Sequence, residues 1–319
     1  MRRFPAFLAI VFVCGQLVFW SAFSQAQVRF ASGFRFNPHY VLPVTAALEK
    51  GLWENQGVKV KWLPFRSTTT MNRAVAAGEI DMGSVGLNSL IKAVSAGIAQ
   101  VAVADPAIST DFYFWVRSDA RIKTPKDLKG AKLGVTRFGS ESHAYAVAVL
   151  RALGVEKDVK VLSMGGGRVQ IAALKTGGID ISNLSFFTMA AVKARGEVRS
   201  VLRANDYLPK DYQHLHLIYS LRDFLKNNPA RARKIIKGFL QGAEFVMKNR
   251  SWTIDQLKAG YRYPQAAAEL AYPLLQYDVK GKLNKSRARS AIKFLVENNL
   301  LARDKAPPLA KLFAEGYTP

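Results

Sequence analysis

Small polar residues gather at four places in the chain, each where an apolar run gives way to a segment with helical periodicity. The first half contributes Ser67, Thr68, Thr69 and Thr70, followed by Ser84, Asn88 and Ser89. The second half contributes Gly139, Ser140, Ser142 and His143, followed by Asn183 and Ser185. Hydroxyls, amides and backbone N–H groups at helix starts suit the binding of an oxyanion. Helix capping is the alternative role, and one hydroxyl can cap a helix and still contact a ligand.

Three arginines in or beside these segments could supply positive charge to an anionic ligand. They are Arg66, Arg137 and Arg168. A guanidinium group pairs with a carboxylate or sulfonate through two hydrogen bonds, whereas the default place for an arginine is the solvated surface. The residues after the first predicted strand are further candidates for the wall and hydrogen bonds of a binding site. They are Phe36, Asn37 and His39.

Metal binding and catalysis have less support. His214 and His216 alternate on a predicted strand and share a face, which is the spacing of two metal ligands, but no third ligand is identifiable. Asp81 and Asp180 could pass for paired carboxylates, but each follows a glycine-terminated helix, which favours a structural role in a turn. The chain has no Gly-x-Ser-x-Gly elbow and no zincin motif. We therefore predict no catalytic residue, no metal and no cofactor.

The segments that hold these residues occur twice. The frame Ala-x-x-x-Gly-x-Ile-Asp ends at Asp81 and again 99 residues later at Asp180, and Gly97 and Gly196 keep the same offset. Strand-like segments at 28–34, 58–65, 132–138 and 159–164 alternate with helix-like segments such as 43–51 and 143–154. This alternation is typical of βαβ units and predicts parallel-rich sheets flanked by helices. Two copies of one α/β half predict two lobes, with a ligand held beyond the carboxyl ends of the strands.

Composition limits the class of protein. The chain has 319 residues, 49% hydrophobic and 22% charged, which suffices for two domains with buried cores. Its net charge of +23 suits an anionic partner, but the basic residues are scattered and no groove-reading element is apparent. We therefore interpret the charge as a solvated basic surface and predict no nucleic-acid partner. No strand is followed by Gly-x-Gly-x-x-Gly, which argues against a dinucleotide-binding fold.

The first 26 residues have the pattern of a secretory signal peptide. Arg2 and Arg3 precede an apolar run over 4–23, and small residues at 24–26 offer a cleavage site before Gln27. An uncleaved membrane anchor is the alternative, since the run approaches the roughly 20 residues that span a bilayer. Cleavage would remove Cys14, the single cysteine, and with it any disulfide or cysteine nucleophile.

Five stretches, in their order and spacing, carry a resemblance to a known family. They are NPHYVLPVTAALEKGLWENQGVKVKW, AVAAGEIDMGSVG, KTPKDLKGAKLGV, GSESHAYAVAVLRALGV and AALKTGGIDIS. The chain resembles the periplasmic solute-binding components of ABC importers of the nitrate, sulfonate and taurine type, a group that includes proteins related to thiamine-precursor binding. The resemblance covers nearly all of residues 28–319.

The resemblance implies a two-lobed α/β fold of the periplasmic binding protein type, with two chain crossings near 111–118 and 212–220. It implies a first lobe made of 27–109 and 206–319, including the C-terminal helices, and a second lobe made of 110–205. The implied function is capture of a small anionic solute, resembling a sulfonate, nitrate or carboxylate, by hinge closure. The implied partners of this exported, monomeric protein are a membrane permease and its ATPase subunits. The alternative is an exported enzyme of the same fold that acts on a small organic acid.

Overall fold

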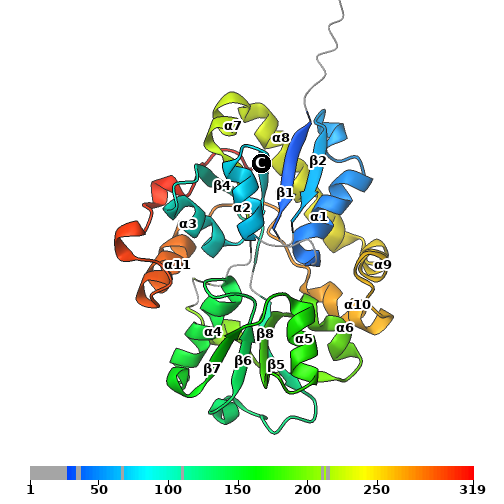
Figure 1. The fold of residues 1–319 in the computed structure, drawn as a ribbon. Coiled ribbons are helices and arrows are strands. Elements are labelled where there is room, and N and C mark those ends of the chain that lie inside the picture. Colours follow the sequence, from blue (N-terminus) through cyan, green and yellow to red (C-terminus); the bar gives the residue numbers. More distant parts are fainter. Residues whose placement is uncertain (1–26, 34–36, 66–67, 109–110, 210–211, 213–215) are drawn as a thin grey trace, which may run out of the picture.

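The protein folds into two lobes, each built around a five-stranded sheet (Figure 1). The computed structural model describes residues 27–33, 37–65, 68–108, 111–209, 212 and 216–319. The predicted signal peptide and Cys14 lie outside these residues. Within the described part of the chain, no helix is long and apolar enough to cross a membrane.

The first lobe surrounds a sheet with the strand order β2-β1-β3-β10-β4. Its strands are β1 (Val28–Ser32), β2 (Val60–Pro64), β3 (Met82–Val85), β4 (Gln100–Ala104) and β10 (Leu217–Leu221). Its first three helices are α1 (Pro38–Glu49), α2 (Thr68–Ala76) and α3 (Leu87–Ser95). Strand β1 runs parallel to β2 and β3, whereas β10 runs antiparallel to β3 and β4 because it enters the sheet from the second lobe.

The second lobe repeats this arrangement with the strand order β7-β6-β8-β5-β9. Its strands are β5 (Phe112–Arg117), β6 (Lys132–Val135), β7 (Lys160–Ser163), β8 (Ile181–Ser185) and β9 (Val198–Arg203). Its helices are α4 (Glu141–Ala152), α5 (Gly167–Lys175) and α6 (Phe186–Ala194). In each sheet the fourth strand, β10 or β5, is the antiparallel one. The duplication predicted from the 99-residue offset is therefore confirmed, as are the parallel-rich sheets.

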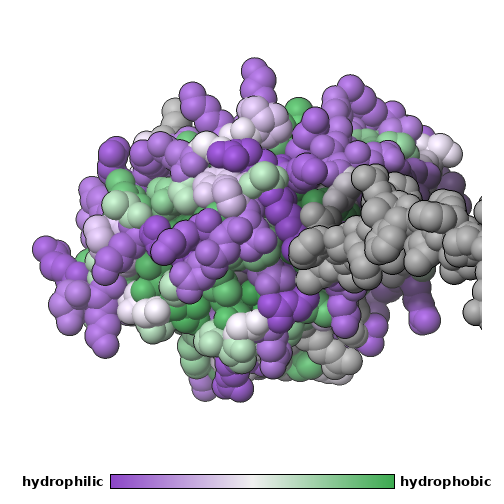
Figure 2. All heavy atoms as spheres, turned by 90° about the horizontal axis from the view of Figure 1, so that it is seen from above, coloured by the Kyte–Doolittle hydropathy of each residue, from purple (hydrophilic) through white to green (hydrophobic). Residues whose placement is uncertain are grey.

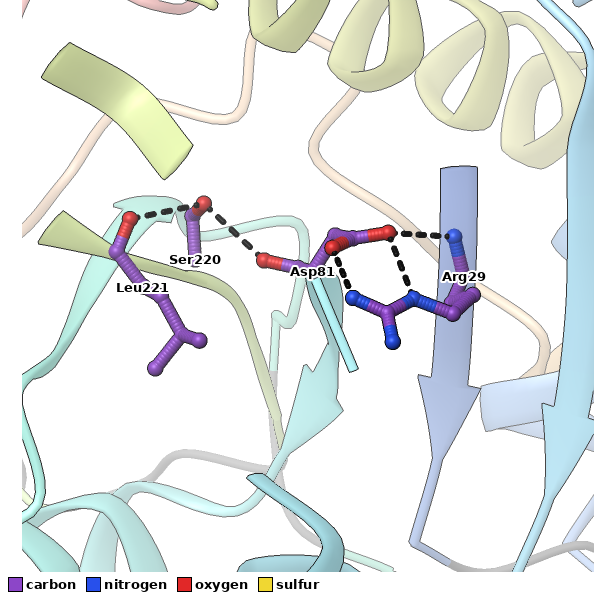
Figure 3. A network of polar contacts seen from close by, with 4 residues as sticks. All are labelled: Arg29, Asp81, Ser220 and Leu221. Atoms are coloured by element: carbon purple, nitrogen blue, oxygen red, sulfur yellow. Dashed lines mark hydrogen bonds and ion pairs between the residues drawn. The ribbon is translucent and has the colours of Figure 1, made fainter. Parts of the chain in front are cut away.

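The repeated aspartates hold equivalent places and explain why the frame occurs twice. Asp81 lies directly before β3, and its Oδ2 accepts a hydrogen bond of 2.8 Å from the backbone N–H of Arg29 in β1. Asp180 lies directly before β8, and its Oδ2 accepts a bond of 2.8 Å from the backbone N–H of Lys132 in β6. Figure 3 shows that the Arg29 guanidinium also pairs with both carboxylate oxygens of Asp81. Both aspartates join neighbouring strands, as the structural interpretation predicted.

The C-terminal helices hold the first lobe together and reach the second. They are α7 (Arg222–Asn227), α8 (Pro229–Lys248), α9 (Arg250–Tyr261), α10 (Gln265–Ala271) and α11 (Lys285–Glu297). Helix α8 packs along α1, where Gly242 lets the two backbones approach: a methyl group there would lie 3.1 Å from the Pro43 carbonyl carbon. Helix α11 packs on α3, whereas α10 packs on α6 of the second lobe. The tail therefore contacts both lobes, and the lobe boundaries at 109–110 and 205–206 stay a prediction.

Apolar residues fill the space between sheets and helices in both lobes. Trp53 is buried between α1 and α8, where its indole N–H donates to the Ile235 carbonyl at 2.8 Å. Trp115 is its counterpart in the second lobe and donates to the Leu184 carbonyl at 2.9 Å. Hydrophilic residues cover most of the face seen from above, with apolar residues showing between them (Figure 2). This distribution is typical of a water-exposed α/β protein.

Candidate functional site

The two lobes touch where the start of α3 meets the start of α4. A methyl group added at Gly86, the N-cap residue of α3, would lie 2.5 Å from the carboxyl carbon of Glu141, the first residue of α4. The Lys92 ammonium, also on α3, donates to the backbone carbonyl of Gly139. We call this contact of Gly86 and Lys92 with Gly139 and Glu141, together with Asn88 on the same helix as Lys92, the interlobe junction. A ligand held here would contact both lobes.

The loop before α4 is organised by its own hydroxyls. Ser140 caps α4: its Oγ accepts from the backbone N–H of His143 at 3.3 Å and donates to the Arg137 carbonyl at 2.6 Å. Ser142 Oγ accepts from the backbone N–H of Thr136 at 2.9 Å. Capping, which the sequence left open beside ligand binding, is therefore one role of Ser140, whereas Ser142 ties the loop residue Thr136 to the start of α4.

His143 lies on the same turn. Its Nδ1 accepts from the backbone N–H of Gly139 at 3.1 Å. Burial, and then the Lys92 charge, lower the pKa of its imidazole. His143 is therefore neutral at pH 7, and it does not supply positive charge to an anion.

Ser84 and Asn183 occupy equivalent positions, but inside strands rather than in loops. Ser84 lies in β3 and Asn183 in β8, and both are fully buried. The prediction that they lie in loops after the strands is wrong, because both strands continue further toward the junction than the apolar runs suggested. Asn183 Nδ2 donates to the Ser142 carbonyl at 2.6 Å, which fixes the amide orientation since a carbonyl only accepts. Asn183 Oδ1 and Ser84 Oγ have no hydrogen-bond partner among the described residues.

Glu141 is the most unusual residue at the junction, and the sequence interpretation did not single it out. Its side chain is buried, with 6% of the residue exposed. Burial raises the pKa of its carboxyl to about 8, the Lys92 ammonium opposes the rise, and Asp111 adds to it. Burial likewise lowers the pKa of Lys92. An acid at the first position of a helix is ordinary in a sequence, so no local signal marked Glu141.

Asp111 is a second buried acid that the sequence interpretation missed. It precedes β5, and its backbone carbonyl accepts from the Phe186 N–H at 2.7 Å. Burial raises the pKa of its carboxyl to about 6, while the Ser185 hydroxyl and the backbone near Phe187 favour the charged form. Ser185 also caps α6, because its Oγ accepts from the Thr188 N–H at 3.3 Å.

His39 and Asn37 lie at the start of α1, beside the crossing to β10. Asn37 caps this helix, since its Oδ1 accepts from the His39 N–H at 3.0 Å. His39 Nε2 lies 3.0 Å from the Gln276 carbonyl and must donate to it, so its Nδ1 accepts from His216 Nδ1 at 3.4 Å when both rings are neutral. His216 lies directly before β10, which begins at Leu217, and its partner is His39. The prediction that His214 and His216 share a face of one strand is therefore wrong for His216, which precedes the strand. His214 lies outside the described residues.

Aromatic rings surround this region. Tyr40 and Tyr145 are buried, and the Glu141 charge is among the causes that raise the pKa of the Tyr40 hydroxyl, after burial itself. The Tyr145 and Tyr212 rings pack edge to face at 5.9 Å. Tyr212 also accepts a hydrogen bond of 2.6 Å from Asn88 Nδ2 on α3. The junction is thus lined by tyrosines and buried acids.

The remaining candidates lie at the edge of this region or outside the described residues. Arg137 and Arg168 have exposed side chains. Thr68 begins α2, and its hydroxyl accepts from Ser89 Oγ at 3.4 Å. Phe36, Arg66 and Ser67 lie outside the described residues. Among the described candidates, the junction therefore gathers Asn88, Gly139, Ser140, Ser142, His143 and Asn183.

Metal ligands were not expected at this site. Within the described ranges, no group of three or more His, Cys, Asp or Glu side chains could hold a metal ion. A cavity of about 370 Å³ lies elsewhere, among residues such as Arg117, Asp127 and Asp180 at the opposite end of the second sheet. It contains charged side chains on an exposed edge, and none of the candidate residues lines it.

Comparisons with known proteins fit this geometry. The chain matches the family model described as NMT1/THI5 like over residues 38–251. A putative binding protein of Brucella abortus (strain 2308) is 26% identical over 210 residues, which cover 66% of this chain and 64% of that protein.

Two solved structures share the fold. The periplasmic aliphatic sulphonate binding protein SsuA from Escherichia coli superposes with a TM-score of 0.77 at 21% identity, covering 90% of this chain and 92% of that one. The desulfurization enzyme DSZB superposes with a TM-score of 0.66 at 14% identity, covering 91% and 97%. The two-lobed α/β architecture implied by the sequence resemblance is confirmed, and the chain belongs to the NMT1/THI5-like family with the periplasmic binding protein fold.

Proposed function

We propose that the protein binds a small solute between its two lobes and passes it to a membrane permease of an ABC importer with its ATPase subunits. The observation that carries this proposal is the interlobe junction, where the starts of α3 and α4 meet. A ligand that contacts both lobes favours the closed arrangement over the open one, because only the closed arrangement makes both sets of contacts. Hinge closure around the solute follows from this difference.

The relatives support a solute of the sulfonate type. SsuA from Escherichia coli is named for aliphatic sulphonate binding, and its structure shares the fold. The sequence likewise predicted an anionic solute that resembles a sulfonate, nitrate or carboxylate. Helix α5 has Gly166 as its N-cap residue and no side-chain cap, so the backbone N–H groups of its first turn are one place for an anionic group. We place the protein in the periplasm as a monomer, exported through the signal pattern of residues 1–26.

A ligand screen tests this proposal. The melting temperature of the protein is measured with nitrate, alkanesulfonates, taurine, aromatic carboxylates and pyrimidines, each at several concentrations. A specific solute stabilises the folded protein by about 2.7 kcal/mol at a hundredfold excess over its Kd. Calorimetry of each stabilising compound then gives the Kd, and uptake of that compound by cells with and without the gene tests delivery to a permease.

An enzyme of the same fold is the second candidate, since DSZB combines this fold with a desulfurization activity. The likeness is one of fold alone at 14% identity. Turnover distinguishes the two candidates: a binding protein returns the bound solute unchanged after denaturation, whereas an enzyme releases a product that mass spectrometry detects.

A further inference from the structure

We infer that the solute presents a nitrogen donor group, a protonated amine or amidine, to the Glu141 carboxyl at the interlobe junction. This inference rests on the proposed binding function and deepens it by naming a chemical group of the solute. Three observations support it: the buried Glu141 carboxyl without a hydrogen-bond partner among the described residues, the unpaired polar atoms of Asn183 and Ser84, and the buried tyrosines nearby.

The first observation is that Glu141 is buried and has no polar partner among the residues that the structure describes. Its residue is 6% exposed, and no hydrogen bond or ion pair within 4.0 Å reaches its carboxyl group from the described residues. Buried polar groups in folded proteins are nearly always hydrogen-bonded, and an exception calls for an explanation such as a missing ligand. Lys92, the nearest opposing charge, donates its ammonium to the Gly139 carbonyl instead. Glu141 therefore has acceptor capacity that the lobes leave unused.

The second observation is that the neighbouring unpaired atoms include a fixed acceptor. Asn183 Nδ2 donates to the carbonyl of Ser142, the residue that follows Glu141, so Asn183 Oδ1 is held as an acceptor. That oxygen is buried and has no partner among the described residues. Across the junction, Ser84 Oγ is also buried without a partner. On the second lobe the Glu141 carboxyl and Asn183 Oδ1 thus both lack donors, so a donor group on a solute complements them, and the Ser84 hydroxyl can adapt because it both donates and accepts.

The third observation is the aromatic surroundings. Tyr40 and Tyr212 are buried, and after burial itself the Glu141 charge helps to raise the pKa of both hydroxyls; the Tyr145 ring on α4 packs against Tyr212. Tyrosine faces attract cations, and this attraction grows when the site excludes water. Once ionised, a Glu141 carboxylate near tyrosine rings suits an ammonium or amidinium group and repels a sulfonate. An anionic part of the same solute would have to lie away from Glu141, for example toward α5.

The inference predicts that binding of the solute releases a proton. With its pKa raised to about 8 by burial, the Glu141 carboxyl is mostly protonated at pH 7. A cationic group placed against it favours the ionised form, so binding releases a proton to the solvent. Calorimetry in two buffers of different ionisation enthalpy measures this release directly.

Matched pairs of probes test the inference on the full chain. The pairs are taurine with ethanesulfonate, benzamidine with benzamide, and 4-aminopyrimidine with pyrimidine. The member of at least one pair that carries the amine or amidine group is expected to raise the melting temperature while its partner does not, and to release a proton at pH 7. Glu141→Gln should weaken that probe about tenfold to a hundredfold, the usual effect of losing a charge-assisted hydrogen bond. The matched control is Glu156→Gln, which removes an acid that pairs with Arg151 at the surface.

Three results would overturn the inference. They are a panel in which no amine or amidine probe stabilises the protein more than its partner does, a binder whose affinity Glu141→Gln leaves unchanged, and binding without proton release. Stabilisation by nitrogen-free anions, independent of Glu141, would refute this inference and leave the proposed binding function standing. Absence of solute binding together with measured turnover would instead reject the binding function itself.

Discussion

Replacement of Gly86 by alanine should push the two lobes apart, because the added methyl group clashes with Glu141. The added methyl group would lie 2.5 Å from the Glu141 carboxyl carbon and 2.7 Å from its Oε2, where ordinary contacts are 3.4–4 Å. Its Oε1 lies closer still, so the carboxyl group must move by more than about 1 Å, and Glu141 is too buried to move freely. The backbone of Gly86 has φ −68° and ψ 148°, which alanine adopts without strain, so the effect is one of packing.

The size of the effect follows from the overpacking of a closed interface. Such overpacking costs about 1–3 kcal/mol, and here the cost falls on the closed arrangement alone because opening the lobes separates Gly86 from Glu141. The population of closed molecules, and with it the affinity for a solute held between the lobes, should fall about fivefold to 150-fold. Glu141→Ala combined with Gly86→Ala should restore closure, because the double variant removes the clashing carboxyl.

Spin labels on the two lobes measure this closure. In a Cys14→Ser background, cysteines at Glu79 in the first lobe and Lys157 in the second carry the labels, since both residues are exposed. Gly86→Ala should shift the label distances toward longer values. The matched control is Gly166→Ala, which also replaces an N-cap glycine but finds no atom within 4 Å of the new methyl group. If Gly86→Ala moves the distances no further than Gly166→Ala, or the double variant fails to restore them, the proposed packing of Glu141 against Gly86 is refuted.

Three further predictions concern stability. Glu141→Gln should flatten the pH dependence of the free energy of unfolding. The folded pKa of about 8 exceeds the unfolded value of 4.5, so wild-type stability falls between these pH values as the pH rises, by about 4–5 kcal/mol at most. Unfolding free energies from urea titrations at pH 5–8 that change equally with pH in both proteins would contradict this. Asp81→Ala and Asp180→Ala should each lower the free energy of unfolding by about 1–3 kcal/mol without changing Kd, because each removes an acceptor from a strand-joining N–H; a selective loss of affinity would contradict their structural role. Gly242→Ala should destabilise the folded protein because the new methyl group clashes with the Pro43 carbonyl. Gly260→Ala in α9, where no atom lies within 4 Å of the new methyl group, should stabilise it by about 0.5–1 kcal/mol. Similar changes in melting temperature for both variants would show that α1 and α8 are not closely packed at Gly242.

The fold could be predicted because its signals are local and repeated. The Asp81 and Asp180 frames each mark a helix end followed by a buried strand, and their equal spacing revealed the duplication before any contact was known. Caps at Ser140 and Ser185 were likewise readable, since a capping hydroxyl bonds to N–H groups within three residues of itself.

The chemistry of the junction could not be predicted because it depends on contacts between distant segments. Glu141 is an ordinary helix-start acid until Gly86, 55 residues earlier, packs against it and excludes water. His216 forms a hydrogen bond with His39, 177 residues away in the sequence, and no strand periodicity indicates this contact. The sequence also placed Arg137 and Arg168 near polar loops as candidates for an anion; both side chains are exposed, and their part in ligand binding stays a prediction.

The position of the bound solute tests the central claim most directly. A crystal structure of the complex with the most stabilising compound of the ligand screen locates it. We predict that the solute lies at the interlobe junction, within hydrogen-bond distance of groups from both α3 and the start of α4, with a nitrogen donor on Glu141. A solute held by one lobe alone, or bound away from Gly86 and Glu141, would contradict the account.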